Sequence, residues 1–152
     1  MRHKPTKDLT LPHQTIPTYA LYGEFLSGSL VDDIHHEPLH ERSSRHGWDI
    51  QLHRHRQLAQ VFVFRSPGVF IRAGEIEFIT TQGTVLFVPP MVTHGFRFPQ
   101  DTDGDVITLP AMLMDAVLAT PRLITADQPD QFDPVAQTLH LLARAFHAMG
   151  AE

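Results

Sequence analysis

The chain has 152 residues, of which 42% are hydrophobic and 19% are charged, and its formal net charge is −5. These values describe one soluble domain that is large enough to bury a core of its own. The absence of cysteine excludes a disulfide framework and a thiolate metal cluster, and 12 Lys and Arg against 17 Asp and Glu give no basic surface for DNA. Because no apolar run reaches the length of a signal peptide or a membrane span, we expect a cytoplasmic protein without a membrane partner.

The first 16 residues are polar and interrupted by proline, and we expect them to form a flexible N-terminal arm. From residue 17 to residue 110, short alternating or β-branched runs recur about every ten residues between turn residues, which is typical of a β-sandwich or barrel. The predicted strands are Thr18–Tyr22, Ile34–His40, Trp48–His55, Ala59–Arg65, Val69–Ala73, Ile76–Thr80, Thr84–Val88, His94–Phe98 and Asp105–Leu109. The sequence therefore predicts a mainly β domain.

Residues 111 to 152 have the composition of a helical tail. One predicted helix covers Pro110–Ala119, with proline at its first position, and a second begins at Asp133 as its N-cap and ends at Met149. The second helix carries apolar residues at alternating steps of four and three, which either pack on the β domain or form the seam of a homodimer. The residues of this predicted dimerisation stripe are Val135, Leu139, Leu142 and Phe146.

Histidine is the unusual residue of this composition, with eleven copies. A neutral imidazole is both a hydrogen-bonding group and a metal ligand near pH 7. His53 and His55 lie two residues apart on a predicted strand and therefore share one face of it. The spacings around them and around a third histidine are Gly47-x5-His53-x-His55-x4-Gln60 and Gly83-x5-Pro89-x4-His94.

Together these two elements resemble the two motifs of the cupin superfamily, over residues 47 to 98. The resemblance implies a double-stranded β-helix, or jelly-roll barrel, followed here by one or two helices. Three positions depart from the family pattern: Gln60 stands in place of the metal-binding glutamate, Met91 in place of a glycine and Phe98 in place of an asparagine. Without the carboxylate, three imidazoles and an amide remain, a set still compatible with Zn²⁺.

The polar residues of the motifs allow two interpretations. In one, His53, His55 and His94 hold zinc or another divalent metal; in the other, no cofactor is required and they form an inward polar layer with Gln60, hydrogen-bonded within itself or to a ligand. If His53 points inward and the side chains before it alternate strictly between the two faces of the strand, the apolar residues of this strand point outward. Either a β-bulge precedes His53, between it and Leu52, or other elements cover the outer face.

In each of the two motifs, the strand that carries the last polar residue also carries aromatic rings on the same face. An imidazole or amide at one end, with phenyl rings further along, suits a flat aromatic ligand with a polar head, although such rings can also be core residues. The predicted ligand-binding residues are His53, His55, Gln60, Phe62, Phe64, His94 and Phe96. For a ligand carboxylate the candidates are the imidazoles and four arginines. Alternation places Arg97 outside the cavity, so we favour the imidazoles over Arg97. The four arginines are Arg42, Arg45, Arg72 and Arg97.

Several stretches resemble the sensor domain of AraC-type transcriptional regulators, in the branch that activates aromatic-acid catabolism, such as the 4-hydroxybenzoate and hydroxyphenylacetate regulators. They are residues 16–24, 41–43, 48–50, 53–56, 88–90, 94–98 and 101–104. The resemblance implies a domain without catalytic residues that binds a small aromatic acid, forms a homodimer, and reaches DNA only through a C-terminal helix-turn-helix module. Since no such module begins before Glu152, we expect a piece of a longer regulator or a stand-alone sensor.

Two other functions remain open. A metal-dependent monocupin enzyme, of isomerase or dioxygenase type, would use His53, His55 and His94 to hold its metal, and the missing glutamate argues against it. A sugar-binding sensor is the second, because a fold does not determine its ligand.

Overall fold

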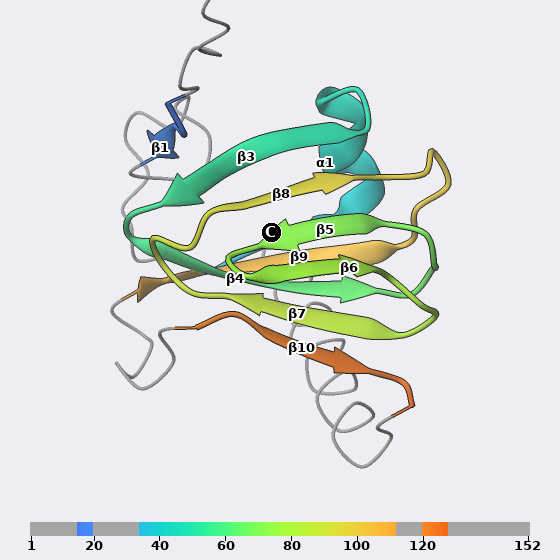
Figure 1. The fold of residues 1–152 in the computed structure, drawn as a ribbon. Coiled ribbons are helices and arrows are strands. Elements are labelled where there is room, and N and C mark those ends of the chain that lie inside the picture. Colours follow the sequence, from blue (N-terminus) through green and yellow to red (C-terminus); the bar gives the residue numbers. More distant parts are fainter. Residues whose placement is uncertain (1–14, 20–33, 112–119, 128–152) are drawn as a thin grey trace, which may run out of the picture.

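The computed structural model describes residues 15–19, 34–111 and 120–127, which form two five-stranded β-sheets and one short helix (Figure 1). The mainly β fold class is therefore confirmed. Most of the predicted N-terminal arm, nearly all of the predicted helix Pro110–Ala119 and the whole second helix lie outside the described residues. The predicted dimerisation stripe of Val135, Leu139, Leu142 and Phe146 lies there as well. Within the described residues, no helix is long and apolar enough to cross a membrane.

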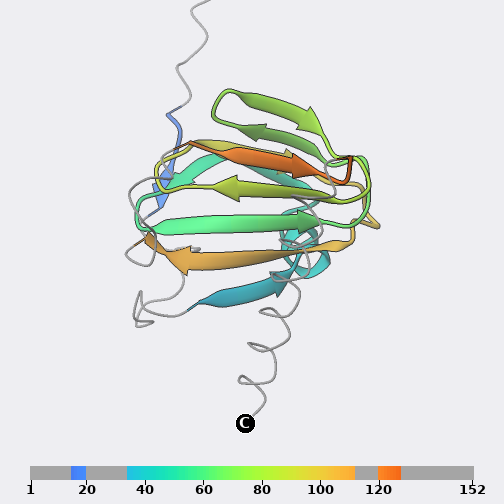
Figure 2. The same cartoon turned by 90° about the horizontal axis from the view of Figure 1, so that it is seen from below.

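The strands of each sheet are not consecutive in the chain. One sheet has the order β1 (Thr18–Tyr19), β3 (Asp49–His55), β8 (His94–Arg97), β5 (Phe70–Ala73) and β6 (Ile76–Ile79). The other has the order β10 (Arg122–Thr125), β7 (Thr84–Val88), β4 (Leu58–Phe64), β9 (Gly104–Pro110) and β2 (His35–Pro38), and Figure 2 looks onto it. Neighbouring strands are antiparallel except for β1 and β3, which are parallel.

Each of the nine predicted strands overlaps an observed strand, but two elements were not predicted. Helix α1 (Leu39–Arg45) replaces the end of the expected strand Ile34–His40, and β10 adds a strand to the second sheet. The helix begins after Pro38, whose side chain makes no capping hydrogen bond. With seven residues and one large apolar side chain on its inner face, α1 has too little periodicity to be visible in the sequence.

The core lies between the two sheets. Its aromatic centre consists of rings from β4 and β8 and the residue after β8: Phe62 and Phe96 have their ring centroids 4.6 Å apart, and Phe96 and Phe98 have theirs 5.5 Å apart. The remaining members are Leu39, Ile50, Phe64, Val69, Ile71, Ala73, Leu86, Val88 and Val106. The alternation predicted for the two motif strands is therefore present, with their phenyl rings on the inner faces.

A β-bulge in β3 turns the histidines inward. Ile50 pairs with Phe96, but the next registered pair is His53 with His94, so β3 has one more residue than β8 between the two pairs. As a result Ile50 and His53 are both buried, while Gln51 is exposed. The bulge is the first of the two alternatives that the sequence left open, and it lies between Ile50 and His53.

Candidate functional site

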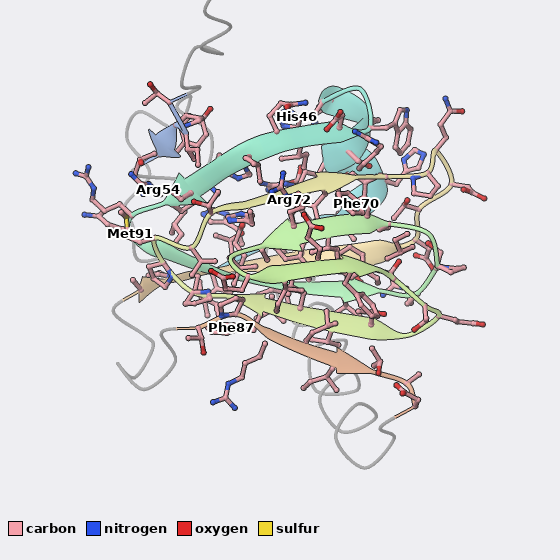
Figure 3. All side chains as sticks on the ribbon, viewed as in Figure 1. His46, Arg54, Phe70, Arg72, Phe87 and Met91 are labelled. Carbon is pink, nitrogen blue, oxygen red and sulfur yellow. The ribbon has the colours of Figure 1, made fainter. Side chains whose placement is uncertain are left out.

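Three buried histidines converge between the sheets. His53 and His55 come from β3 and His94 from its neighbour β8, and their exposed fractions are 6%, 3% and 1%. One ring nitrogen from each lies within 4.8 Å of the other two. The cluster belongs to the end of the sandwich where β3 finishes, the end at which Arg54 and Met91 are labelled in Figure 3. The structure thus brings together the three histidines that the motif spacing selected.

Hydrogen bonds fix which nitrogen of two of these rings carries the proton. Nδ1 of His53 lies 2.8 Å from the carbonyl oxygen of Gln51, and Nδ1 of His94 lies 2.8 Å from that of Val92. A carbonyl oxygen only accepts, so each Nδ1 carries hydrogen and donates it. Burial lowers the pKa of His53, and it lowers the pKa of His94 well below the usual value, helped by the charge of His53. Both rings are therefore neutral near pH 7, and each has its lone pair on Nε2.

Gln60 approaches His94 from the opposite sheet. Its Oε1 lies 3.0 Å from Nε2 of His94, and its Nε2 lies 3.3 Å from Oγ1 of Thr108. Because Nε2 of a neutral His94 is an acceptor, the amide satisfies both neighbours when rotated by half a turn: its NH₂ then donates to His94 and its oxygen accepts from the Thr108 hydroxyl. An amide suits this position better than a carboxylate, which could not donate to the ring.

Aromatic rings enclose the histidines on two sides. Tyr19 of β1 is half-buried, with its ring centroid 5.8 Å from that of His53 and 6.1 Å from that of His55. On the inner side, Phe62 and Phe96 have their centroids 6.3 and 6.0 Å from that of His94. The sequence did not identify Tyr19 as a site residue. Tyr19 only belongs to the stretch 16–24, which is one of those that resemble the sensor domain.

The phenylalanines predicted to bind a ligand are packed against one another. Phe62 and Phe64 are fully buried, with stacked rings 6.0 Å apart, and Phe96 contacts both. They form an apolar layer directly beneath the histidines. Their contact with a ligand stays a prediction, as does that of the histidines and Gln60.

The four candidate arginines occupy very different places. Arg97 is exposed, Arg72 is half-exposed beside Glu77 on the outer side of its sheet, and the side chain of Arg45 is 69% exposed. Arg42 is buried on the inner face of α1 and lies 3.6 Å from a carboxylate oxygen of Glu37. Burial lowers the pKa of Arg42 to about 9, so it is still a cation near pH 7. Its charge also lowers the pKa of His53 and of His94, in addition to the larger effect of burial.

Comparison with known proteins assigns neither a family to the chain nor a function to the site. No protein-family model matches the chain, and no curated protein matches it. The site is therefore interpreted from its own chemistry.

Proposed function

We propose that the chain is the effector-sensing domain of a transcriptional regulator, and that it binds a small aromatic acid inside a cupin-like jelly roll. The order of the strands supports this fold. Each sheet alternates strands from the two halves of the domain, in the sequences β2-β9-β4-β7 and β3-β8-β5-β6, which is the pattern of two interlocked Greek keys.

The observation that carries the function is the polar layer inside the sandwich. Three buried imidazoles and an amide stand on one side of an apolar layer of phenyl rings. Buried polar groups are costly unless they have partners. A hydroxylated aromatic acid offers such groups hydrogen bonds and a charge, and offers the rings an apolar face.

Thermal denaturation with a panel of hydroxybenzoates and hydroxyphenylacetates tests this function. At about 100 times its dissociation constant a ligand stabilises the fold by about 2.7 kcal/mol, and at about 2 to 4 °C per kcal/mol we expect the melting temperature to rise by roughly 5 to 10 °C. His53→Asn should abolish the shift, whereas His46→Asn, in the exposed turn after α1, should keep it. A shift with simple sugars alone would favour a sugar sensor, and a shift with neither class would overturn the sensor function.

The same proposal includes partners that lie outside the described residues. A homodimer through Val135, Leu139, Leu142 and Phe146 should be weakened by Leu142→Asp, because the change buries an unpaired charge, and light scattering measures this. DNA binding would need a module beyond this chain, so we expect residues 1–152 to show no sequence-specific shift in a gel assay.

A second candidate is a metal-dependent monocupin enzyme, and one observation favours it. The backbone carbonyls that hold Nδ1 of His53 and His94 orient both Nε2 lone pairs, as outer partners do for metal-ligating histidines. Three imidazoles fit Zn²⁺, which would draw the nitrogens from within 4.8 Å to about 3.3 Å of one another at a bond length of about 2.0 to 2.1 Å. Metal analysis that finds one iron or manganese per chain, together with turnover of a substrate, would establish this function in place of the sensor.

A further inference from the structure

Gln60 and Thr108 face the histidine cluster from the opposite sheet. Gln60 on β4 pairs with Thr108 on β9, and residues directly opposite each other in a sheet have their side chains on the same face. Gln60, Thr108 and His94 are each only 1% exposed. Because bulk water does not reach these side chains, their polar atoms need partners within the protein.

The three side chains form one continuous run of hydrogen bonds. One terminal atom of the Gln60 amide lies 3.0 Å from Nε2 of His94, and the other lies 3.3 Å from Oγ1 of Thr108. Nδ1 of His94 donates to the carbonyl oxygen of Val92, so Nε2 of the neutral ring can only accept. The direction of the run is therefore fixed: the Thr108 hydroxyl donates to the amide oxygen, and the amide NH₂ donates to Nε2 of His94.

The hydrogen bond from Gln60 uses the lone pair that a metal ion would need at His94. A neutral imidazole has one nitrogen lone pair, which either accepts a hydrogen bond or binds a metal. In His94 this lone pair is on Nε2, because Nδ1 carries the proton. A divalent ion bound by the three clustered imidazoles, whose nitrogens lie within 4.8 Å of one another, must therefore displace the NH₂ group of Gln60.

We propose that Gln60 sets the metal affinity of the cluster by competing with a divalent ion for the lone pair of His94. This inference goes beyond the proposed function and does not depend on an aromatic ligand. A carboxylate at position 60 cannot donate to the ring, so it leaves the lone pair to the metal and adds a charged oxygen ligand. The amide blocks the lone pair instead. Its removal therefore strengthens zinc binding, even though an oxygen that could itself contact the metal is lost.

Zinc affinity, measured on metal-free protein by competition with a chromophoric chelator, tests the sign of this effect. Gln60→Leu keeps most of the side-chain volume but can neither donate to His94 nor bind a metal. One hydrogen bond is worth about 2- to 10-fold in an equilibrium constant, so Gln60→Leu should bind zinc tighter than the wild-type protein by about that factor. Gln60→Glu should bind it tighter still. If Gln60→Leu binds zinc no tighter than the wild type, the inference is wrong.

Two controls locate the effect at His94. In His94→Asn the contested lone pair is gone, so adding Gln60→Leu to this variant should not change its zinc affinity; an equal gain in both backgrounds would overturn the inference. Thr84→Val is the matched control for a lost buried hydrogen bond in the same sheet. Thr84 is fully buried and donates to the carbonyl oxygen of Thr81, outside the cluster, so its substitution should leave the zinc affinity unchanged.

Nitrogen NMR of the wild-type protein tests the same bond without any substitution. In the metal-free protein, the ring correlations of His94 should identify Nδ1 as the protonated nitrogen. Saturating zinc should shift the Nε2 resonance of His94 and, with it, the side-chain NH₂ resonances of Gln60. If Nε2 carries the proton in the metal-free protein, or if zinc leaves the Gln60 resonances in place, the amide does not compete and the inference is wrong.

The outcomes separate the inference from the two candidate functions. If Gln60→Leu gains zinc affinity and no aromatic acid binds the wild-type protein, the inference stands and the aromatic ligand is wrong. If an aromatic acid binds and Gln60→Leu gains nothing, the sensor function stands and the competition is wrong. A wild-type protein that binds zinc as tightly as Gln60→Glu would overturn the inference and favour the metal-dependent enzyme.

Discussion

The backbone N–H of Met91 donates a hydrogen bond to the carbonyl oxygen of His55, with 2.7 Å between nitrogen and oxygen. This bond joins the end of β3 to the turn that leads into β8, and therefore connects the two halves of the histidine cluster. Met91 makes it with a φ of 64°, in the left-handed region. The cupin motif that the sequence resembles has glycine at this position, and glycine adopts this φ without strain.

Met91→Gly should stabilise the protein. A non-glycine residue in the left-handed region costs roughly 1 to 2 kcal/mol, and the greater freedom of glycine in the unfolded chain cancels about 0.5 to 1 kcal/mol of the gain. The Met91 side chain is exposed, so little packing is lost. We expect a net gain of about 0.5 to 1 kcal/mol by urea denaturation. Met91→Ala keeps the Cβ atom and should gain nothing; an equal gain from alanine would show that the methionine side chain, not the backbone, is responsible.

Gly95→Ala should disrupt the bulge that turns His53 inward. A Cβ atom on Gly95 would lie 2.8 Å from the carbonyl oxygen of Ile50 and 3.1 Å from the nitrogen of Leu52, and these backbone atoms belong to the bulge. Relieving the overlap should cost about 1 to 3 kcal/mol of unfolding free energy and should weaken ligand or metal binding. Arg97→Ala, at an exposed position of the same strand, is the control and should change neither. Unchanged stability and binding in Gly95→Ala would show that the bulge tolerates a larger neighbour.

The histidine cluster could be predicted because its information is local. A two-residue spacing places His53 and His55 on one face of any strand, and the second motif adds His94 from the neighbouring strand. The bulge could be inferred only as a conflict in the alternation pattern, since the extra residue is visible only in the pairing of β3 with β8.

The burial of Arg42 could not be predicted in the same way. It depends on a seven-residue helix that connects two different sheets, and on Glu37, whose position is defined by the pairing of β2 with β9. Both are long-range relationships, whereas the sequence near Arg42 resembles an ordinary charged surface segment. For the same reason no local pattern ranks Arg42 above Arg45, which lies only three residues away.

The stability of the protein should fall as the pH drops below about 6.5, because of the buried histidines. Burial, and then the charge of His53, hold the pKa of His94 well below its usual value of 6.5. Below that pH the unfolded chain takes up a proton that the folded protein does not, so the free energy of unfolding decreases with falling pH, by up to about 1.4 kcal/mol per pH unit for one such group. Above pH 6.5 this residue contributes no pH dependence.

Urea denaturation between pH 5 and pH 8, in the presence of a chelator, measures this slope. His94→Gln should have a shallower slope than the wild-type protein between pH 5 and pH 6.5, while His46→Gln, at an exposed position, should match the wild type. Equal slopes in all three proteins would mean that His94 takes up its proton at the same pH in the folded and unfolded states.

Asp105→Asn should destabilise the outer face of the second sheet. The carboxylate of Asp105 accepts hydrogen bonds from Nη1 of Arg65 and, at 2.8 Å, from Nε2 of His36. Burial alone would raise the pKa of Asp105, but the hydrogen bonds from Arg65 and His36 outweigh it and lower the pKa below 3.8. Because a hydrogen bond to a charged group is worth about 1.5 to 3 kcal/mol, we expect a loss of that size at pH 7. The exposed Asp101→Asn should cost little.

The pH dependence of this loss identifies its origin. A carboxyl group with a lowered pKa in the folded state contributes stability that is complete well above pH 3.8, the ordinary pKa of an aspartate, and that is lost as the pH falls through the folded pKa. The difference in unfolding free energy between the wild-type protein and Asp105→Asn should therefore be constant from pH 7 to about pH 5 and shrink below pH 4, where the wild-type carboxyl group becomes protonated and resembles the amide. A difference that stays constant down to pH 2.5 would show that the introduced amide is destabilising through its shape and that the charge of Asp105 contributes nothing.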